Sequence, residues 1–266
     1  SGAGTTVVVH ETLAARTQPK SDGTRGRGVE IESGTSLTVD RSALIENSEI
    51  GLAIFDPGTS ANVSESLVLQ TQPWSDGNTG RGMQVKDGGA LEVDRVSLVE
   101  NHDIALAALG GGTSLTVNGS LITGTRRGFG GGYGHGIGVQ DDPSFAITGS
   151  ALVDNHDVSL LVVRSDTSVS VTEVYVSGTG TTTEGLRGVG IGLREAKGFS
   201  VERVVIEESS MAGLFIELSD GEVSHAMVAN TSLDADDMGD GLLVTQSVVT
   251  ATGIVSHSNA RAGVLF

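Results

Sequence analysis

A near-verbatim internal repeat limits this chain to a narrow group of folds. Residues 17–55 read TQPKSDGTRGRGVEIESGTSLTVDRSALIENSEIGLAIF, and residues 71–109 read TQPWSDGNTGRGMQVKDGGALEVDRVSLVENHDIALAAL. A marker glycine then recurs at intervals of 54, 54, 52 and 53 residues, at Gly28, Gly82, Gly136, Gly188 and Gly241. Self-similarity at such a period predicts a solenoid, in which each repeat buries its apolar face against the next.

Each repeat divides into two coils. A second marker separates a short coil of about 23 residues from a longer one of about 30, at Gly51, Ala105, Ser159, Gly213 and Gly263. Each coil holds three short alternating segments, such as Val29–Ile31, Leu37–Val39 and the segment around Leu44. Period-2 alternation predicts strands with one buried face. Three strands per coil, stacked ~4.8 Å apart, predict a single all-β domain over residues 1–266, a parallel solenoid of about ten coils.

Two polar columns accompany the apolar ones. Asparagine recurs four residues before the second marker, with Ser209 in the remaining place, at Asn47, Asn101, Asn155 and Asn259. Threonine recurs before the other coil, at Thr17, Thr71, Thr125, Thr179 and Thr231. Asparagine tolerates left-handed backbone angles and can stack its amides from coil to coil. We therefore expect separate asparagine and threonine ladders with a structural role.

The composition excludes several classes of function. The net charge is −17, with only 16 lysines and arginines, which argues against a nucleic-acid partner. No apolar run approaches the roughly 18 residues of a membrane-spanning helix, so no direct membrane insertion is expected. The chain has no cysteine, which rules out a disulfide framework and a zinc–thiolate site. Aromatic residues make up 3% of the chain, so Val, Ile, Leu and Ala must fill the core.

The coil pattern resembles a known family. Glycine–apolar–x–apolar, a turn, Ser-Leu-Thr-Val and then Ser-x-Leu-x-x-Asn is similar to the coil of the right-handed parallel β-helix in the pectate-lyase-like superfamily, from Gly4 to Phe266. That resemblance implies a solenoid shared by polysaccharide lyases, hydrolases, epimerases, adhesins and phage tailspikes, so the fold alone does not choose a function. We expect a segment of a longer bacterial secreted or cell-surface protein. Exposed sheet edges at the solenoid ends would favour end-to-end or edge contacts with another chain.

Five extended turns, at 17–28, 71–82, 125–136, 179–188 and 231–241, are predicted to form a ridge on one side of the solenoid. The first four turns contain seven basic residues and three acidic ones, a net charge of +4. The remainder of the chain therefore has a net charge of −21. Aromatic rings cover sugar faces, and arginine pairs with carboxylate or sulfate. The candidate ligand-binding residues are Arg25, Arg27, Trp74, Arg81, Arg126, Arg127, Phe129, Tyr133, His135 and Arg187. The alternative is that these loops pack on each other, with their aspartates pairing the arginines.

The segment 133–142 contains two fragments that resemble polygalacturonase motifs, Gly-His-Gly and Gln-Asp-Asp. In that family the paired aspartates act as general acid and base, and the resemblance makes Asp141, Asp142 and His135 the catalytic candidates. The order and spacing of the fragments differ from the family, and Pro143 places both aspartates in a turn. A non-catalytic chain is therefore the preferred interpretation.

An acidic loop near the C-terminus offers a candidate metal site. Asp234, Asp236, Asp237 and Asp240 lie within seven residues, and calcium prefers such hard oxygen ligands. The spacing matches no EF-hand, so a solvated acidic turn without any cofactor is the alternative.

Together these observations favour a non-catalytic secreted or surface module that binds a polysaccharide or a protein partner through the ridge of long loops. The alternative is a polysaccharide lyase or glycoside hydrolase of the pectate-lyase-like type. Because a catalytic site should interrupt the repetition locally, the divergent loop 125–136 is where such a site would be expected.

Overall fold

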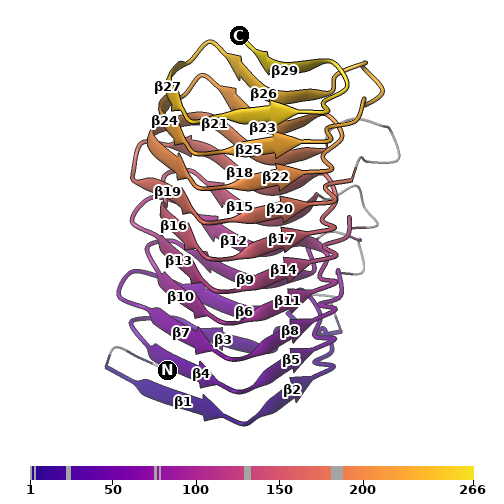
Figure 1. The fold of residues 1–266 in the computed structure, drawn as a ribbon. Coiled ribbons are helices and arrows are strands. Elements are labelled where there is room, and N and C mark those ends of the chain that lie inside the picture. Colours follow the sequence, from indigo (N-terminus) through magenta and orange to yellow (C-terminus); the bar gives the residue numbers. More distant parts are fainter. Residues whose placement is uncertain are drawn as a thin grey trace.

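The computed structural model is a parallel β-solenoid with 29 strands among the residues that it describes, and Figure 1 shows its rungs stacked along one axis. It describes residues 2, 4–21, 25–74, 77, 79–128, 133–180 and 188–266. The described residues form no helix, and hence none long and apolar enough to cross a membrane. The all-β, right-handed parallel β-helix predicted from the repeat is confirmed.

Each rung contributes one strand to each of three parallel sheets, which we call A, B and C in chain order. Sheet A holds β1 (Thr6–His10), β4 (Ser36–Asp40), β7 (Ser60–Ser64), β10 (Ala90–Asp94), β13 (Ser114–Asn118), β16 (Ser144–Thr148), β19 (Val169–Thr172), the second half of β21 (Val189–Glu202), β24 (Asp220–Ser224) and β27 (Val248–Thr252). Sheet B holds β2 (Leu13–Ala15), β5 (Ala43–Ile45), β8 (Leu67–Leu69), β11 (Ser97–Val99), β14 (Leu121–Thr123), β17 (Ala151–Val153), β20 (Tyr175–Ser177), β22 (Val205–Glu207), β25 (Met227–Ala229) and β28 (Val255–His257). Sheet C holds β3 (Val29–Ile31), β6 (Ile50–Phe55), β9 (Arg81–Lys86), β12 (Asp103–Leu109), β15 (Gly134–Gln140), β18 (Val158–Ser165), the first half of β21, β23 (Ala212–Glu217), β26 (Asp240–Thr245) and β29 (Ala262–Leu265).

The strand register confirms the two-coil repeat. Thr6 pairs with Ser36, Ser36 with Ser60, and Ser60 with Ala90, so successive rungs are 30, 24 and 30 residues apart. We number the rungs from 1, which contains β1, to 10, which contains β29. The marker glycine of rung 7 is Gly190 rather than the predicted Gly188, because Val158 pairs with Val189 and a Cβ on Gly190 would lie 2.6 Å from the Gly213 carbonyl.

The core is a narrow column of aliphatic side chains along the axis. Alternate residues of every strand point inward, as in the burial of Leu37 and Val39 in β4 and of Leu52 and Ile54 in β6. Branched aliphatic residues fill this space because only three short strands surround it, and Phe199 is the largest side chain that is fully buried.

The asparagines and threonines form one column, not the two separate ladders predicted. Asn101 and Thr71 lie on successive rungs, and Asn101 Oδ1 accepts a hydrogen bond from the Thr71 amide at 3.1 Å. Asn101 Nδ2 donates to the Val68 carbonyl at 3.2 Å. The same bond to a threonine amide recurs at Asn47–Thr17, Asn155–Thr125 and Asn259–Thr231. Because the repeat spans two rungs, each asparagine bonds the backbone of a threonine rung instead of stacking on another asparagine.

A single left-handed residue turns the chain from sheet A to sheet B on every rung. From rung 1 to rung 10 these residues are Glu11, Arg41, Glu65, Arg95, Gly119, Gly149, Glu173, Arg203, His225 and Gly253, and each has a positive φ. We call them the corner column. Left-handed angles are uncommon outside glycine, and here the amide of each of these residues in rungs 1 to 9 donates to a carbonyl of the next rung, as in Arg95 to Asn118.

Candidate functional site

The five long loops all connect a sheet B strand to the next sheet C strand. They follow β2, β8, β14, β20 and β25, and their described residues lie on one side of the solenoid, at the right of Figure 1. The ridge therefore borders the outer face of sheet C. Phe129 and Arg187 lie outside the described residues.

Two predicted ligand-binding arginines are held by carboxylates of the next rung. Arg27 donates from Nε and Nη2 to Glu49 at 3.1 and 3.0 Å, and Arg81 donates from Nε to Asp103 at 3.0 Å. The Glu49 and Asp103 side chains are buried, at 5% and 6% exposure. Burial alone would lower the pKa of Arg27, but hydrogen bonding and charge from Glu49 outweigh it, so the pKa is raised.

The same two positions lie next to each other on successive rungs in every repeat. His135 and Asp157 occupy them in the third repeat, with Nε2 and Oδ2 3.9 Å apart, and both side chains are buried. In the fifth repeat the charges are exchanged, since Arg261 Nε donates to the fully buried Asp240 at 2.9 Å. We call these positions the cross-rung pair. This pair was not predicted from the sequence, although its signal is present there: an acidic residue stands 22 residues after each of Arg27, Arg81 and His135.

The fourth repeat has an apolar version of the cross-rung pair. Val189 pairs with Ala212, so Val189 and Met211 occupy the two positions. Both line a pocket of about 190 Å³ on the outer face of sheet C, together with Leu161 and Phe215. Gly192 contributes no side chain to this pocket, and the ion pair of Arg194 with Glu217, at 2.9 Å, lies at its rim.

A second pocket on the same outer face is charged. It has a volume of about 430 Å³ and lies over rungs 1–3. Its basic residues are Arg25, Arg27, Arg81 and Lys86, and its acidic residues are Glu30, Glu32, Glu49, Asp56 and Asp87. The Phe55 ring lies 4.8 Å from the Arg27 guanidinium carbon and 5.2 Å from Lys86 Nζ, distances at which cations are attracted to the face of a ring.

The other predicted ligand-binding residues of the ridge differ in how exposed they are and in whether other residues of the chain already contact them. Arg25 is exposed, and Arg126 pairs with Glu100 at 2.9 Å while remaining more than half exposed. Arg127 is half-buried and engaged, and Trp74 is half-buried with its indole Nε1 buried. Tyr133 is 50% exposed and stacks on His135, with ring centroids 4.7 Å apart.

The predicted catalytic residues do not come together. His135 lies at the start of β15, and Asp141 and Asp142 follow its last residue, Gln140. Six extended residues span about 20 Å, so the histidine and the aspartates lie at opposite ends of the strand. Asp141 pairs with Arg164 at 2.7 Å, and Asp142 accepts the Asp166 amide at 2.9 Å.

The acidic loop is largely occupied by internal contacts. Asp234 Oδ1 accepts the amides of Asp236 and Met238 at 3.0 and 2.9 Å, while Asp240 is bound by Arg261. Asp236 and Asp237 are exposed. Across the part of the chain that the structure describes, no three acidic or histidine side chains are grouped to hold a metal ion.

The histidines that follow the asparagine column cap backbone groups. His102 Nδ1 is 2.9 Å from the Thr71 carbonyl, and His156 Nδ1 is 3.0 Å from the Thr125 carbonyl, so Nδ1 carries the proton in each. Burial lowers the pKa of His102, and the hydrogen bond to Thr71 opposes that shift.

These features define the class by fold: a right-handed parallel β-helix. No family model matches the chain, and no curated protein sequence matches it. Among solved structures, pectate lyase Pel9A superposes with a TM-score of 0.58 at 11% identity, covering 97% of this chain and 71% of that chain. QnrB1, a plasmid-mediated fluoroquinolone resistance protein, superposes with a TM-score of 0.32 at 9% identity, covering 93% and 92% of the two chains. At 11% identity the comparison with Pel9A shows the fold alone.

Proposed function

We propose that this chain is a non-catalytic binding module of a bacterial secreted or cell-surface protein, and that it recognises an extended polysaccharide on the outer face of sheet C. One observation carries the proposal: this face holds both a charged pocket over rungs 1–3 and an apolar pocket over rungs 6–8. Five rung steps separate the two centres, about 24 Å at the usual strand spacing. A polymer lying along the axis would contact both pockets.

Each pocket suits a different part of such a ligand. Arg25 is exposed, so its guanidinium is available for a carboxylate or sulfate of an acidic sugar. Phe215 is half-buried in the apolar pocket, where its ring would cover a sugar face. The cross-rung pair positions Arg27 and Arg81 at the floor of the charged pocket.

A screen against acidic and neutral polysaccharides tests the proposal, with binding and chain cleavage measured in the same samples. We expect binding without cleavage, weakened about tenfold by Arg25→Ala or by Phe215→Ala. Asn62→Ala, on the exposed outer face of sheet A, is the matched control and should bind like the parent chain. Unchanged binding in both pocket variants would contradict the assignment of this face.

One observation favours the alternative, a polysaccharide lyase or glycoside hydrolase. The charged pocket places Glu30 and Glu32 among basic side chains, and acid–base cleavage of a glycan needs such groups on one face. The same screen decides: cleavage that is lost in Glu30→Gln while binding persists would establish an enzyme.

A further inference from the structure

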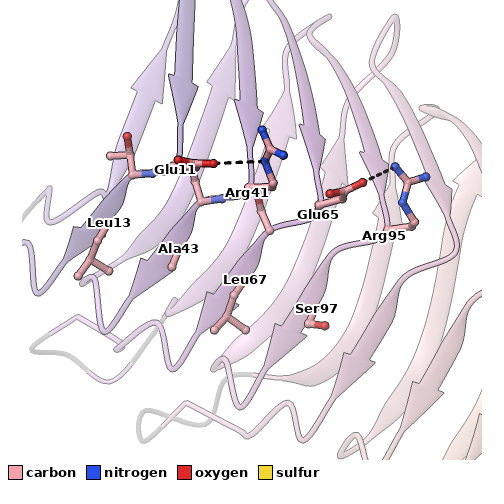
Figure 2. A pocket seen from close by; sticks show the side chains of 11 residues that line it. Glu11, Leu13, Arg41, Ala43, Glu65, Leu67, Arg95 and Ser97 are labelled. Carbon is pink, nitrogen blue, oxygen red and sulfur yellow. Dashed lines mark hydrogen bonds and ion pairs between the residues drawn. The ribbon is translucent and has the colours of Figure 1, made fainter.

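A groove runs along the corner between sheets A and B, on a different face from the proposed polysaccharide site. Figure 2 shows its first half, where Glu11, Arg41, Glu65 and Arg95 of the corner column stand above the outward side chains of sheet B. These four side chains are 48–67% exposed. Acidic and basic residues alternate because the repeat spans two rungs, and neighbours pair at 3.8 Å (Arg41–Glu11) and 3.1 Å (Arg95–Glu65).

The outward column of sheet B beside the corner alternates in size with the same period. From rung 1 to rung 8 it reads Leu13, Ala43, Leu67, Ser97, Leu121, Ala151, Tyr175 and Val205. Leu13, Leu121 and Tyr175 are 65%, 38% and 39% exposed. The outer face of sheet A, by contrast, is polar, with Thr38, Asn62 and Glu92 in successive rungs. An apolar column that is left exposed in this way is typical of an interaction surface.

The alternation stops at rungs 5 and 6, where Gly119 and Gly149 replace the charged residues. The result is a notch two rungs wide, with Leu121 and Ala151 in its floor and with Arg95 and Glu173 at its two ends. The backbone does not require glycine at rungs 5 and 6, because Glu65 and Arg95 adopt the same positive φ at the equivalent positions of rungs 3 and 4. A Cβ on Gly149 would meet nothing within 4 Å.

We propose that two copies of this chain associate antiparallel through this corner, about a two-fold axis perpendicular to the solenoid and passing between rungs 4 and 5. Rung n then faces rung 9 − n, so every odd rung meets an even one. Glu11 faces Arg203 of the partner subunit, and Arg41 faces Glu173 of the partner subunit. Opposite charges therefore meet at both ends of the contact, where rungs 1 and 2 face rungs 8 and 7.

The same two-fold axis also fills the notch and sets large side chains of sheet B opposite small ones. Glu65 faces Gly149 of the partner subunit and Arg95 faces Gly119 of the partner subunit, so the long side chains of rungs 3 and 4 enter the partner's notch. Beside the corner, Leu67 faces the partner's Ala151, and Tyr175 faces the partner's Ala43. An axis between rungs 5 and 6 would also match charges, but it would set glycine against glycine and leave the notch empty, which close packing disfavours.

The contact is narrow, about 34 Å long for seven rung steps, so the dimer belongs with small, weak interfaces. Sedimentation velocity over a wide concentration range tests it. We expect the 27.1 kDa chain to shift to twice that mass as its concentration rises through the micromolar range. A chain that stays at 27.1 kDa throughout would overturn the proposal.

A charge-exchange pair identifies the register. Arg41→Glu places like charges opposite each other at two symmetry-related positions. We therefore expect the dissociation constant of the dimer to rise about tenfold. Adding Glu173→Arg should restore association. Within one chain these residues lie five rungs apart, about 24 Å, which is roughly two to three times the screening length at physiological salt, so rescue can only arise between chains. Both substitutions keep residue types that the corner column already holds.

Two further variants complete the test. Gly119→Arg fills the notch and faces the partner's Arg95, so it should abolish the dimer. His225→Glu is the matched control, because rung 9 has no opposing rung, and it should leave association unchanged. Rescue of Arg95→Glu by Glu173→Arg, without rescue of Arg41→Glu, would overturn this register. Polysaccharide binding on sheet C is measured separately and does not depend on the result.

Discussion

At the scale of single residues, charge in this protein is arranged in pairs between rungs. The cross-rung pair is Arg27 with Glu49 in the first repeat, apolar in the fourth, and reversed as Asp240 with Arg261 in the fifth. A buried charge is costly without its partner, whereas a matched apolar pair of similar volume is tolerated. The repeats therefore preserve complementarity at these positions rather than a particular residue.

This complementarity predicts the outcome of a double substitution. Glu49→Met leaves the Arg27 guanidinium with Glu30 alone, and we expect it to destabilise the fold by about 2 kcal/mol. Arg27→Met combined with Glu49→Met should recover most of that loss, because the pair becomes apolar as at Val189 and Met211. Thermal unfolding of the three chains measures this, and additive losses would contradict it.

His102 predicts a pH dependence of stability. Burial lowers its pKa in the folded chain below the ordinary value of 6.5, so between those two values the unfolded chain binds more protons than the folded chain. Stability should therefore fall as the pH drops below about 6.5. His102→Gln should reduce the fall of the melting temperature between pH 7.5 and pH 5. His257→Gln, at an exposed site, should leave that fall unchanged. An equal slope in all three chains would exclude His102 as the cause.

The acidic loop predicts no response to calcium. Asp240 is bound by Arg261 and Asp234 Oδ1 by two backbone amides, which leaves Asp236 and Asp237 as exposed ligands on one side. We expect the melting temperature to be the same with and without calcium. A calcium-dependent rise that disappears in Asp236→Ala would instead establish the metal site.

At the scale of elements, the spacing between rungs excludes side chains at the first marker position of each repeat, whereas the second accepts Ala105 and Ser159. A Cβ on Gly82 would lie 2.5 Å from the Ala105 carbonyl of the next rung and 3.1 Å from the Asn101 amide. The same approach to a backbone carbonyl and an asparagine amide recurs at Gly28, Gly136 and Gly241. Glycine is needed here because two backbones and an asparagine amide meet in one place.

Gly82→Ala should consequently be costly. The strand must move away from its neighbour, at an expected cost of about 2 kcal/mol. Gly111 is the matched control, because a Cβ there would meet nothing within 4 Å and its φ is not positive. Gly111→Ala should leave the unfolding midpoint unchanged, and a similar loss in both variants would refute the packing argument.

At the scale of the whole molecule, stability is distributed unevenly along the axis. Central rungs are covered on both sides, and Leu52, Met83 and Leu106 are fully buried. The inward-facing Val7 in rung 1 and Val249 in rung 10 are only half-buried. In a solenoid each rung is stabilised mainly by its two neighbours, and the end rungs have one.

Amide hydrogen exchange should reflect this gradient. We expect the slowest exchange in β9 to β23 and the fastest in β1 and in β27 to β29, because end rungs can open without disturbing the centre. Mass spectrometry of peptic peptides measures it. Uniform protection from end to end would show that the solenoid opens only as one unit.

The sequence by itself determined the architecture, because a two-coil repeat with period-2 apolarity leaves the parallel solenoid as the way to bury every strand. It also placed the five long loops at the same point of alternate coils, which is between sheet B and sheet C. Only the tertiary structure decided which residues of successive rungs meet. Asn101 with Thr71, Arg81 with Asp103, and the separation of His135 from Asp141 depend on a register of 30 and 24 residues. A shift of one or two residues, as between Gly188 and Gly190, moves a side chain to the other face or to another partner, and a repeat length read from sequence does not resolve it.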